Sequence, residues 1–231
     1  MTTTLITGAN KGLGRETARR LLQLGHTVYL GCRDLERGKR AAAELGGVPV
    51  TIDVTSDASV TAAAARISER TGRLDVLINN AAVPGGFLPA ADTTAADMLA
   101  VYDTNVFGVV RVLRAFLPLL ERSMAPVVVN VSSGMGSLGV TTDPARLEST
   151  LKGLAYPSSK SALNMLTSQY AKSCPRLRIN AVDPGYTATD LNGHLGTQSV
   201  EEGAEVIVWM ASIGPDGPSG TFTDVNGTVP W

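Results

Sequence analysis

The sequence predicts an α/β protein with a single domain, built on a doubly wound parallel sheet of about seven strands with helices on both faces. Short runs of β-branched and apolar residues alternate with longer amphipathic segments along the whole chain. Most of these runs are apolar throughout, as expected of parallel strands that are buried on both faces. A glycine-rich turn follows the first run directly. Together these features indicate right-handed strand–helix–strand units.

The first half of the chain is expected to supply four strands and four helices. The strands are short runs rich in Val, Ile, Leu and Thr, at Thr3–Thr7, Thr27–Cys32, Val48–Asp53 and Leu74–Asn79. The helices have apolar residues at helical spacing, at Gly14–Leu24, Leu35–Leu45, Ala58–Thr71 and Ala95–Leu120.

The second half adds strands at Val127–Val131, Leu177–Val182 and near Thr221–Val225, and helices at Tyr156–Ser173 and Val200–Ser212. Two loops, Gly134–Gly153 and Gly185–Gln198, leave from carboxyl ends of strands, where ligands bind in such folds. We expect one domain over residues 1–231, with a cofactor half at about 1–125 and a catalytic and substrate half at about 126–231.

The composition is that of a globular protein. Hydrophobic residues make up 44% and charged residues 18% of the 231 positions, with a net charge of −1. Scattered basic residues argue against a nucleic-acid partner, and no apolar run is long enough to cross a membrane. The first strand begins too early for a signal peptide, and Cys32 and Cys174 indicate neither a disulfide nor a metal site. We expect a cytoplasmic protein without metal.

A glycine cluster lies between the first strand and the first helix, in the order Thr7-Gly8-Ala9-Asn10-Lys11-Gly12-Leu13-Gly14. Glycines let the backbone turn tightly and approach a pyrophosphate, which then rests on the amides at a helix N-terminus. Such a cluster can also be a mere turn. Its place between strand and helix favours dinucleotide binding.

The end of the second strand indicates which dinucleotide is bound. NAD sites commonly place an acidic residue there, whereas an arginine accommodates the 2′-phosphate of NADP. This strand ends in Cys32-Arg33-Asp34, so Arg33, together with Lys11 of the glycine loop, favours NADP(H). The alternative is a surface arginine paired with Asp34 or Glu36.

Tyr156 and Lys160 are four residues apart, so they project from one face of the expected helix. An ammonium close to a phenol favours the phenolate and lowers the pKa of the tyrosine from its usual value near ~10. Such a tyrosine is a credible general acid or base for a carbonyl/alcohol pair. The same spacing also occurs on ordinary solvated helices, so the pair gains weight only from the rest of the chain.

In this order the motifs resemble the short-chain dehydrogenase/reductase family, a Rossmann-type NAD(P)-binding fold, over nearly the whole chain. The motifs that carry the resemblance are Thr7-Gly8-x-x-x-Gly12-x-Gly14, Asp53-Val54, Asn79-Asn80-Ala81-Ala82, Asn105, Asn130-Val131-Ser132-Ser133, Tyr156 with Lys160, and Pro184-Gly185-Tyr186-Thr187-Ala188-Thr189. The usual Asn-Asn-Ala-Gly motif of the family ends in alanine here.

The resemblance implies the site residues. Ser133 would bind the substrate carbonyl oxygen, Tyr156 would donate the proton, Lys160 would lower the pKa of Tyr156 and bind the nicotinamide ribose, and Asn105 would hold a water of a proton relay. Ser132 would be structural. The residues expected to contact NADP(H) are Gly8, Asn10, Lys11, Gly12, Leu13, Gly14, Arg33, Asp53, Val54, Asn80, Ala81, Tyr156, Lys160, Pro184, Gly185, Thr187 and Thr189.

Ser133 and Tyr156 are separated by more residues than is usual in the family. The added segment, around Val140–Gly153, is similar in kind to the longer insertion of carbonyl-reductase-like members, which tend to be monomers. Because this insertion is shorter, a monomer and a homodimer both stay open.

Two functions fit these observations. One is an NADPH-dependent reductase of a ketone or aldehyde, and the same enzyme with the opposite physiological direction would oxidise an alcohol. The other is a non-catalytic NADP(H)-binding regulator or scaffold, because fold does not dictate activity. The full set of Asn105, Ser133, Tyr156 and Lys160 favours the enzyme.

Overall fold

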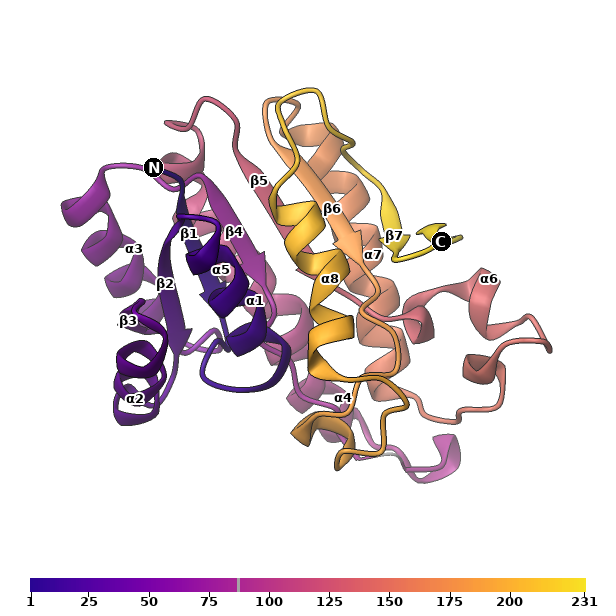
Figure 1. Cartoon of the computed structure of the whole chain (residues 1–231). Helices are drawn as coiled ribbons and strands as arrows, with labels where there is room; N and C mark the ends of the chain where they lie inside the picture. The colour runs from indigo at the N-terminus through magenta and orange to yellow at the C-terminus, as the bar shows by residue number, and fades with distance from the viewer. Residues whose placement is uncertain (87) are drawn as a thin grey trace.

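The computed structural model describes residues 1–86 and 88–231 and is built on one eight-stranded sheet (Figure 1). The strands are β1 (Thr3–Thr7), β2 (Thr27–Cys32), β3 (Val48–Thr51), β4 (Val76–Asn79), β5 (Val127–Val131), β6 (Arg178–Val182), β7 (Phe222–Asp224) and β8 (Gly227–Thr228). Their spatial order is β3-β2-β1-β4-β5-β6-β7-β8. Strands β1 to β7 are parallel, and β8 runs antiparallel to β7. The predicted fold class is confirmed.

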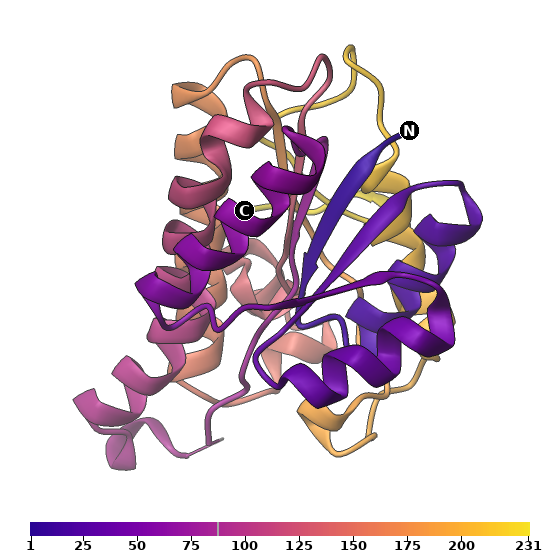
Figure 2. The same cartoon turned by 90° about the vertical axis from the view of Figure 1, so that its left-hand side faces the viewer.

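Helices form a layer on each face of the sheet (Figure 2). One layer contains α1 (Gly12–Gln23), α2 (Leu35–Leu45) and α8 (Val200–Ala211). The other contains α3 (Asp57–Thr71), α4 (Ala95–Tyr102), α5 (Gly108–Leu120) and α7 (Ala155–Ser173). The short helix α6 (Leu138–Thr141) belongs to the insertion and lies to one side.

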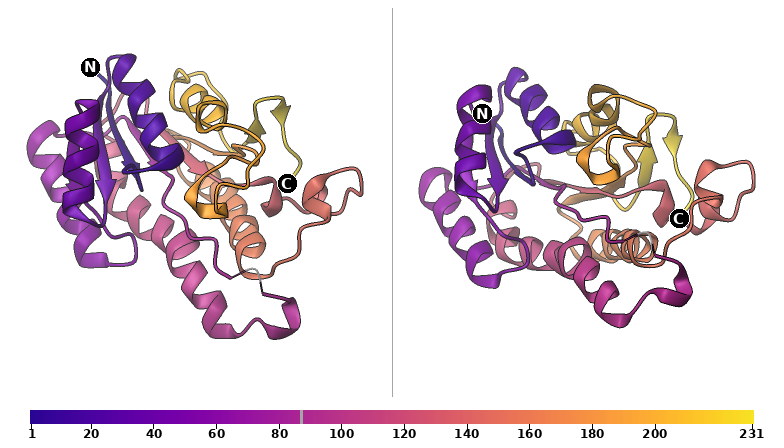
Figure 3. Two further views of the ribbon diagram at one scale, coloured as in Figure 1. Left: turned by 60° about the horizontal axis from the view of Figure 1, so that its bottom comes forward. Right: turned by 90° about the horizontal axis from the view of Figure 1, so that it is seen from below.

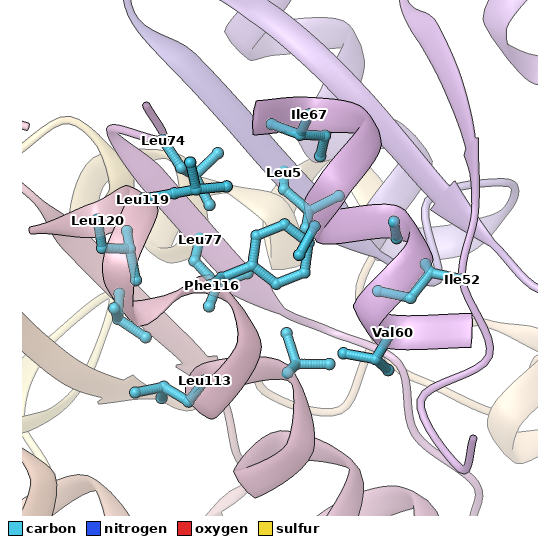
Figure 4. Close-up of a cluster of buried hydrophobic side chains, with 14 of the residues drawn as sticks. Leu5, Ile52, Val60, Ile67, Leu74, Leu77, Leu113, Phe116, Leu119 and Leu120 are labelled. Atoms are coloured by element: carbon cyan, nitrogen blue, oxygen red, sulfur yellow. The ribbon is translucent and has the colours of Figure 1, made fainter. Parts of the chain in front are cut away.

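Successive residues of each buried strand face opposite helix layers, as the two-residue period of a strand requires. Leu5 and Leu77 belong to the core beneath α3 and α5, whereas Ile6 and Ile78 belong to the core beneath α1 and α8. Phe116 is fully buried in the first core, among leucines of β4 and α5 (Figure 4). Burying a side chain of this size contributes roughly 2–3 kcal/mol. Two such cores hold the strand ends in fixed register.

Local sequence signals set most helix boundaries. The Ser56 side chain accepts a hydrogen bond from the Ser59 amide at the start of α3, and Gly72 ends that helix with a φ of 70°. Ser199 and Glu202 form a capping box at the start of α8. Such caps satisfy amides and carbonyls that a helix end leaves free.

The predicted helix Ala95–Leu120 is not one regular helix. A π-helical turn, Asp103–Phe107, separates α4 from α5. Such a turn adds a residue to the helical repeat and is frequent at functional sites. Strand β8 was not predicted, because two residues give no detectable period. The other predicted elements lie within a few residues of their observed bounds.

The carboxyl ends of the parallel strands all point to one end of the molecule, which Figure 3 views from below. The order of strands reverses between β1 and β4, and ligands of doubly wound sheets bind at such a switch point. Over residues 1–86 and 88–231, no helix combines the length and the apolar character needed to cross a bilayer.

Candidate active site

The glycine loop between β1 and α1 has the shape that a bound pyrophosphate needs. Gly8 and Gly12 adopt positive φ values of 67° and 54°, which favour glycine. A Cβ atom at Gly14 would lie 2.5 Å from the Asn80 side-chain nitrogen and 2.6 Å from the Gly8 carbonyl oxygen. The loop therefore excludes side chains where the backbone turns into the helix.

Helix α1 begins at Gly12, inside the glycine loop, and Lys11 is its N-cap residue. No side chain among the described residues caps its first amides. The first amides of a helix have no partner within the helix, and together with the helix dipole they attract an anion. These features fit a dinucleotide pyrophosphate at the amides of Gly12 and Leu13. Leu13 itself packs towards the core of α1 and α8.

Asn80 holds the loop in place from β4. Its side-chain nitrogen donates to the carbonyl oxygens of Thr7 at 2.9 Å and Gly8 at 3.2 Å. The Thr7 hydroxyl in turn accepts from the amides of Asn80 and Ala81, both at 3.0 Å. Asn80 and Ala81 thus fix the glycine loop to the chain that follows β4.

The ends of β2 and β3 border the expected adenosine side. Arg33 is exposed and forms no ion pair within the described parts of the chain, so the alternative of a pair with Asp34 or Glu36 is not observed. Its positive charge helps to hold the pKa of Asp53 below the ordinary value, although hydrogen bonds from Thr55 are the larger cause. Val54 is buried.

Three arginines that the sequence analysis did not name, Arg15, Arg37 and Arg40, lie close to Asn10. A surface hollow of about 200 Å³ is lined by Asn10, Arg15, Arg37, Arg40, Ala41 and Glu44. Arg15 is paired with Glu44 at 2.7 Å. Arg37 lies in the first turn of α2, four residues after Arg33, and its guanidinium is 3.6 Å from the Asp34 carboxylate. Its nearness in sequence to the end of β2 was the one signal that could have identified it.

Lys11 does not point freely toward the adenosine side. Its Nζ forms an ion pair with Asp190 Oδ2 at 2.6 Å. Asp190 belongs to the segment after β6, so the pair joins the glycine loop to that segment. The expected role of Lys11 as a second cation for a 2′-phosphate thus requires it to leave Asp190.

Ser133 follows β5 and is partly exposed, whereas its neighbour Ser132 is buried. The Ser132 hydroxyl donates to Asn164 Oδ1 at 2.6 Å, a contact that fits the structural role expected for it. The Ser133 hydroxyl accepts from the Met135 amide at 3.2 Å. Its proton and remaining lone pair can therefore serve a neighbouring group.

Tyr156 and Lys160 lie in the first turns of α7, beside Ser133. Lys160 is buried, and its Nζ donates to the Val131 carbonyl oxygen at 2.8 Å. The same nitrogen lies 5.5 Å from the centre of the Tyr156 ring. Pro157 stands in the first helical turn, where its missing amide proton costs nothing.

Burial dominates the titration of both groups. It raises the pKa of Tyr156 above the ordinary value, while a hydrogen bond with Ser133 opposes this effect. It lowers the pKa of Lys160 to about 8. The expected lowering of the pKa of Tyr156 by Lys160 is thus not found in the protein alone. At neutral pH a lysine with this pKa still carries its charge, so Lys160 can provide a cation near the phenolate that forms when Tyr156 gives up its proton.

A buried carboxyl group, not singled out from the sequence, lies next to this pair. Asp183 follows β6 and accepts a hydrogen bond from the Gly185 amide at 3.0 Å. Its negative charge acts to raise the pKa of Tyr156 and of Lys160. A Cβ at Gly134 would lie 2.9 Å from Asp183 Oδ2 and 2.9 Å from Glu148 Oε1, so the two carboxyl groups meet there. Burial raises the pKa of Asp183 itself.

Asn105 lies in the π-helical turn and is buried. Its carboxamide bonds both backbone groups of Val83, accepting from the amide at 2.9 Å and donating to the carbonyl at 3.0 Å. It also donates to the Ser159 hydroxyl at 3.1 Å, which donates to the Tyr156 carbonyl at 2.7 Å. Asn105 thus ties the loop after β4 to the start of α7.

The segment after β6 opens with Pro184 and Gly185, whose φ of 73° requires the glycine turn. The Thr187 hydroxyl is buried and accepts from Gln198 Nε2 at 2.9 Å. The Thr187 side chain thus stabilises the segment itself by bonding Gln198. Thr189 lies closer to the glycine loop, with its methyl carbon 3.5 Å from where a Cβ at Gly12 would lie.

The start of the insertion, together with Ser137 and Gly139 just before it, packs against the last residues of the chain. The Ser137 hydroxyl donates to the Pro230 carbonyl at 2.6 Å, and the Gly139 amide donates to the Trp231 carbonyl at 3.2 Å. Val140 is buried with Phe222 in a small separate core. In the described residues, no cluster of potential ligands could hold a metal ion.

The family model described as short chain dehydrogenase matches residues 2–200. Over 223 residues, the chain is 40% identical to the short-chain dehydrogenase anuI of Penicillium roqueforti, covering 91% of this chain and 88% of that protein. It is 33% identical to the (-)-isopiperitenone reductase of Mentha piperita, covering 94% of each.

A similar solved structure is the NADPH-bound carbonyl reductase from chicken fatty liver. It matches with a TM-score of 0.88 and 30% identity, over 100% of this chain and 99% of that one. The fold, the order of the motifs and the sequence identity therefore all indicate the same family.

Proposed function

The chain belongs to the short chain dehydrogenase family and is an oxidoreductase, and from this premise we propose that it uses NADPH to reduce the carbonyl group of a ketone or aldehyde. The observation that carries the proposal is the meeting of Ser133, Tyr156 and Lys160 at the carboxyl ends of β5 and β6. The glycine loop opens at the same end of the sheet. Similar proteins named as reductases support the direction.

Each side chain has a role that follows from its position. The Ser133 hydroxyl binds the substrate oxygen and holds it beside the phenol of Tyr156. NADPH, when bound, would supply the hydride for the new C–H bond. Tyr156 then gives its proton to the oxygen, forming the alcohol. A tyrosine with its ordinary pKa near ~10 is protonated at neutral pH, and burial raises the pKa of Tyr156 further, so it starts the reduction in the form that a general acid needs.

Lys160 and Asn105 support this step. Lys160 is placed to bind the nicotinamide ribose and to stabilise the phenolate that remains after proton transfer. Asn105 positions the start of α7 through Ser159, so that the phenol and the serine keep their relative geometry. Holding reacting groups in a fixed arrangement supplies a large part of enzymatic rate enhancement.

The preference for NADPH over NADH rests on charge. Arg33 is exposed and free of ion pairs among the described residues, and Arg37 and Arg40 follow on α2. An arginine fork matches the oxygens of a phosphate group, and an acidic residue for a free ribose hydroxyl is missing at position 33. Several cations on one side favour the 2′-phosphate.

The test follows absorbance of NADPH and of NADH with a panel of apolar ketones and aldehydes. Tyr156→Phe should lower kcat by about 10²–10⁴-fold and leave the Kd for NADPH nearly unchanged. Tyr170→Phe, on the same helix but packed against the core, is the matched control and should remain active.

Faster turnover with NADH would contradict the assignment of Arg33. Tight NADPH binding without turnover of any carbonyl compound would instead favour a cofactor-binding protein without catalysis. Equal turnover by wild type and Tyr156→Phe would remove Tyr156 from the mechanism.

A further inference from the structure

An ion pair joins the two segments that border the glycine loop. Lys11 Nζ and Asp190 Oδ2 are 2.6 Å apart, although 179 positions separate the two residues in sequence. Lys11 is the N-cap residue of α1, and Asp190 directly follows Thr189, which lies against Gly12. The pair therefore bridges the mouth of the cofactor site that we propose above.

Asp190 is held by more than this lysine. His194 Nε2 lies 2.8 Å from Asp190 Oδ1. The turn around it is fixed by Asn192, whose side chain donates to the Thr187 carbonyl at 2.9 Å and accepts from the Thr189 amide at 3.2 Å. The carboxylate thus keeps its place and one partner when Lys11 moves away.

Lys11 is the movable member of the pair. Its side chain is 58% exposed, and a lysine carries its ammonium on a flexible stem with a single charge. That charge cannot fully neutralise Asp190 and a cofactor phosphate at the same time. An ion pair of Lys11 with one of these anions therefore weakens its interaction with the other.

We propose that Asp190 competes with the 2′-phosphate of NADP(H) for Lys11, so that Asp190 limits how strongly the protein prefers NADP(H) over NAD(H). This inference rests on the proposed function, because it assumes the cofactor side assigned above. Exposed ion pairs are weak, so removing the competitor should tighten binding by about two- to fivefold. The effect should shrink at high salt, where exposed charges are screened.

The experiment measures Kd for NADP⁺ and NAD⁺ by isothermal titration calorimetry at low and high ionic strength. The variants are Asp190→Asn, Lys11→Gln and the double variant. Glu201→Gln is the matched control, because it removes a negative charge near the start of α8 without contacting Lys11. Melting temperatures confirm that each variant is folded.

Asp190→Asn should tighten NADP⁺ by about two- to fivefold and leave NAD⁺ unchanged. The gain should disappear in the Lys11→Gln background and should not occur in Glu201→Gln. An equal effect on both cofactors, or a gain that persists without Lys11, would overturn the competition, because it would reflect simple repulsion by Asp190. Weaker binding of NADP⁺, or no change, would overturn it as well.

The measurement separates this inference from the proposed function. If the wild-type protein binds neither dinucleotide, both fail together. If it binds NADP⁺ and reduces a ketone but Asp190→Asn changes nothing, the competition alone is wrong.

Discussion

Lys160 Nζ lies 5.5 Å from the centre of the Tyr156 ring and donates a hydrogen bond to the Val131 carbonyl oxygen at 2.8 Å. The two residues are neighbours on one face of α7, one helical turn apart. Because both are buried, the pKa of Tyr156 rises and that of Lys160 falls to about 8. Tyr156 is therefore held in its protonated form, beside a lysine whose buried charge lowers the stability of the folded protein.

This cost makes a prediction for stability. The pKa of Lys160 falls from an ordinary value of 10.5 to about 8, so the folded protein binds its proton less readily than the unfolded chain. The penalty is fully present below about pH 8 and disappears as the pH rises toward 10.5, at most about 3 kcal/mol. Lys160→Met removes it, so the free energy of unfolding of wild type relative to this variant should increase between pH 7 and pH 10.

Chemical denaturation across this pH range checks the prediction. Lys172→Met is the control, because Lys172 is exposed on the same helix. Lys160→Met should also lose activity and bind NADPH more weakly. A difference between wild type and Lys160→Met that stays constant with pH would mean that the lysine is not destabilised by burial.

Most of the fold could be predicted from sequence, because the buried strands are short apolar runs and several helices have a capping residue at their start. Ser56 and Ser199, for example, cap α3 and α8 as their residue types suggest. The break in the helix after Tyr102 was not predictable. The residues of the π turn, Asp103–Phe107, have no distinctive composition, and its geometry depends on Asn105 reaching Val83 across space.

The candidate site was predictable where residues are linked by short spacing, as for Tyr156 and Lys160. It was not predictable where partners are distant in sequence. Asp183 meets Glu148 only because β6 and the insertion converge on Gly134. Asp190 reaches Lys11 in the same way. The direction of the pKa of Tyr156 also depends on burial, which no motif encodes.

Asp183 should influence the pH dependence of catalysis. A negative charge disfavours loss of a proton from the phenol of Tyr156 and from the ammonium of Lys160, so it raises both pKa values. Asp183→Asn removes that charge, and the high-pH limb of the kcat profile should move to lower pH.

The charges that face Asp183 define the control. Glu148 approaches it from the insertion and Asp224 from β7, and both add to the rise of its pKa. Asp224→Asn removes a charge that acts on the pKa of Asp183 and should shift the profile less than Asp183→Asn. A profile of Asp183→Asn that superimposes on wild type would show that Asp183 is already protonated where the enzyme works.

The glycine loop should not tolerate a methyl group at Gly14. A Cβ there would lie 2.5 Å from the Asn80 side-chain nitrogen and 2.6 Å from the Gly8 carbonyl oxygen, so the hydrogen bonds of Asn80 must shift. Gly14→Ala should weaken NADPH binding at least about tenfold and lower stability by about 1–3 kcal/mol. Gly214→Ala, with open space around its Cβ position, should change neither quantity in calorimetry and thermal melts.

Asn105 should contribute mainly to the stability of the fold around the site, through its hydrogen bonds to Val83 and Ser159. Asn105→Ala leaves the partly buried backbone groups of Val83 without their side-chain partner and removes a donor from the Ser159 hydroxyl. Unpaired buried polar groups are costly, so the free energy of unfolding should fall by about 2–4 kcal/mol. Activity of the folded variant should fall too, because the start of α7 is no longer tied to the loop after β4.

Ser159→Ala separates the two contributions, because it removes only the link from Asn105 to α7 and leaves Val83 paired. It should cost less stability than Asn105→Ala, about 1 kcal/mol. If positioning of Tyr156 matters, kcat should still fall in this variant at temperatures far below its melting point. A Ser159→Ala enzyme with wild-type kcat would leave Asn105 with a role in stability, or in the proton relay, but not in orienting Tyr156.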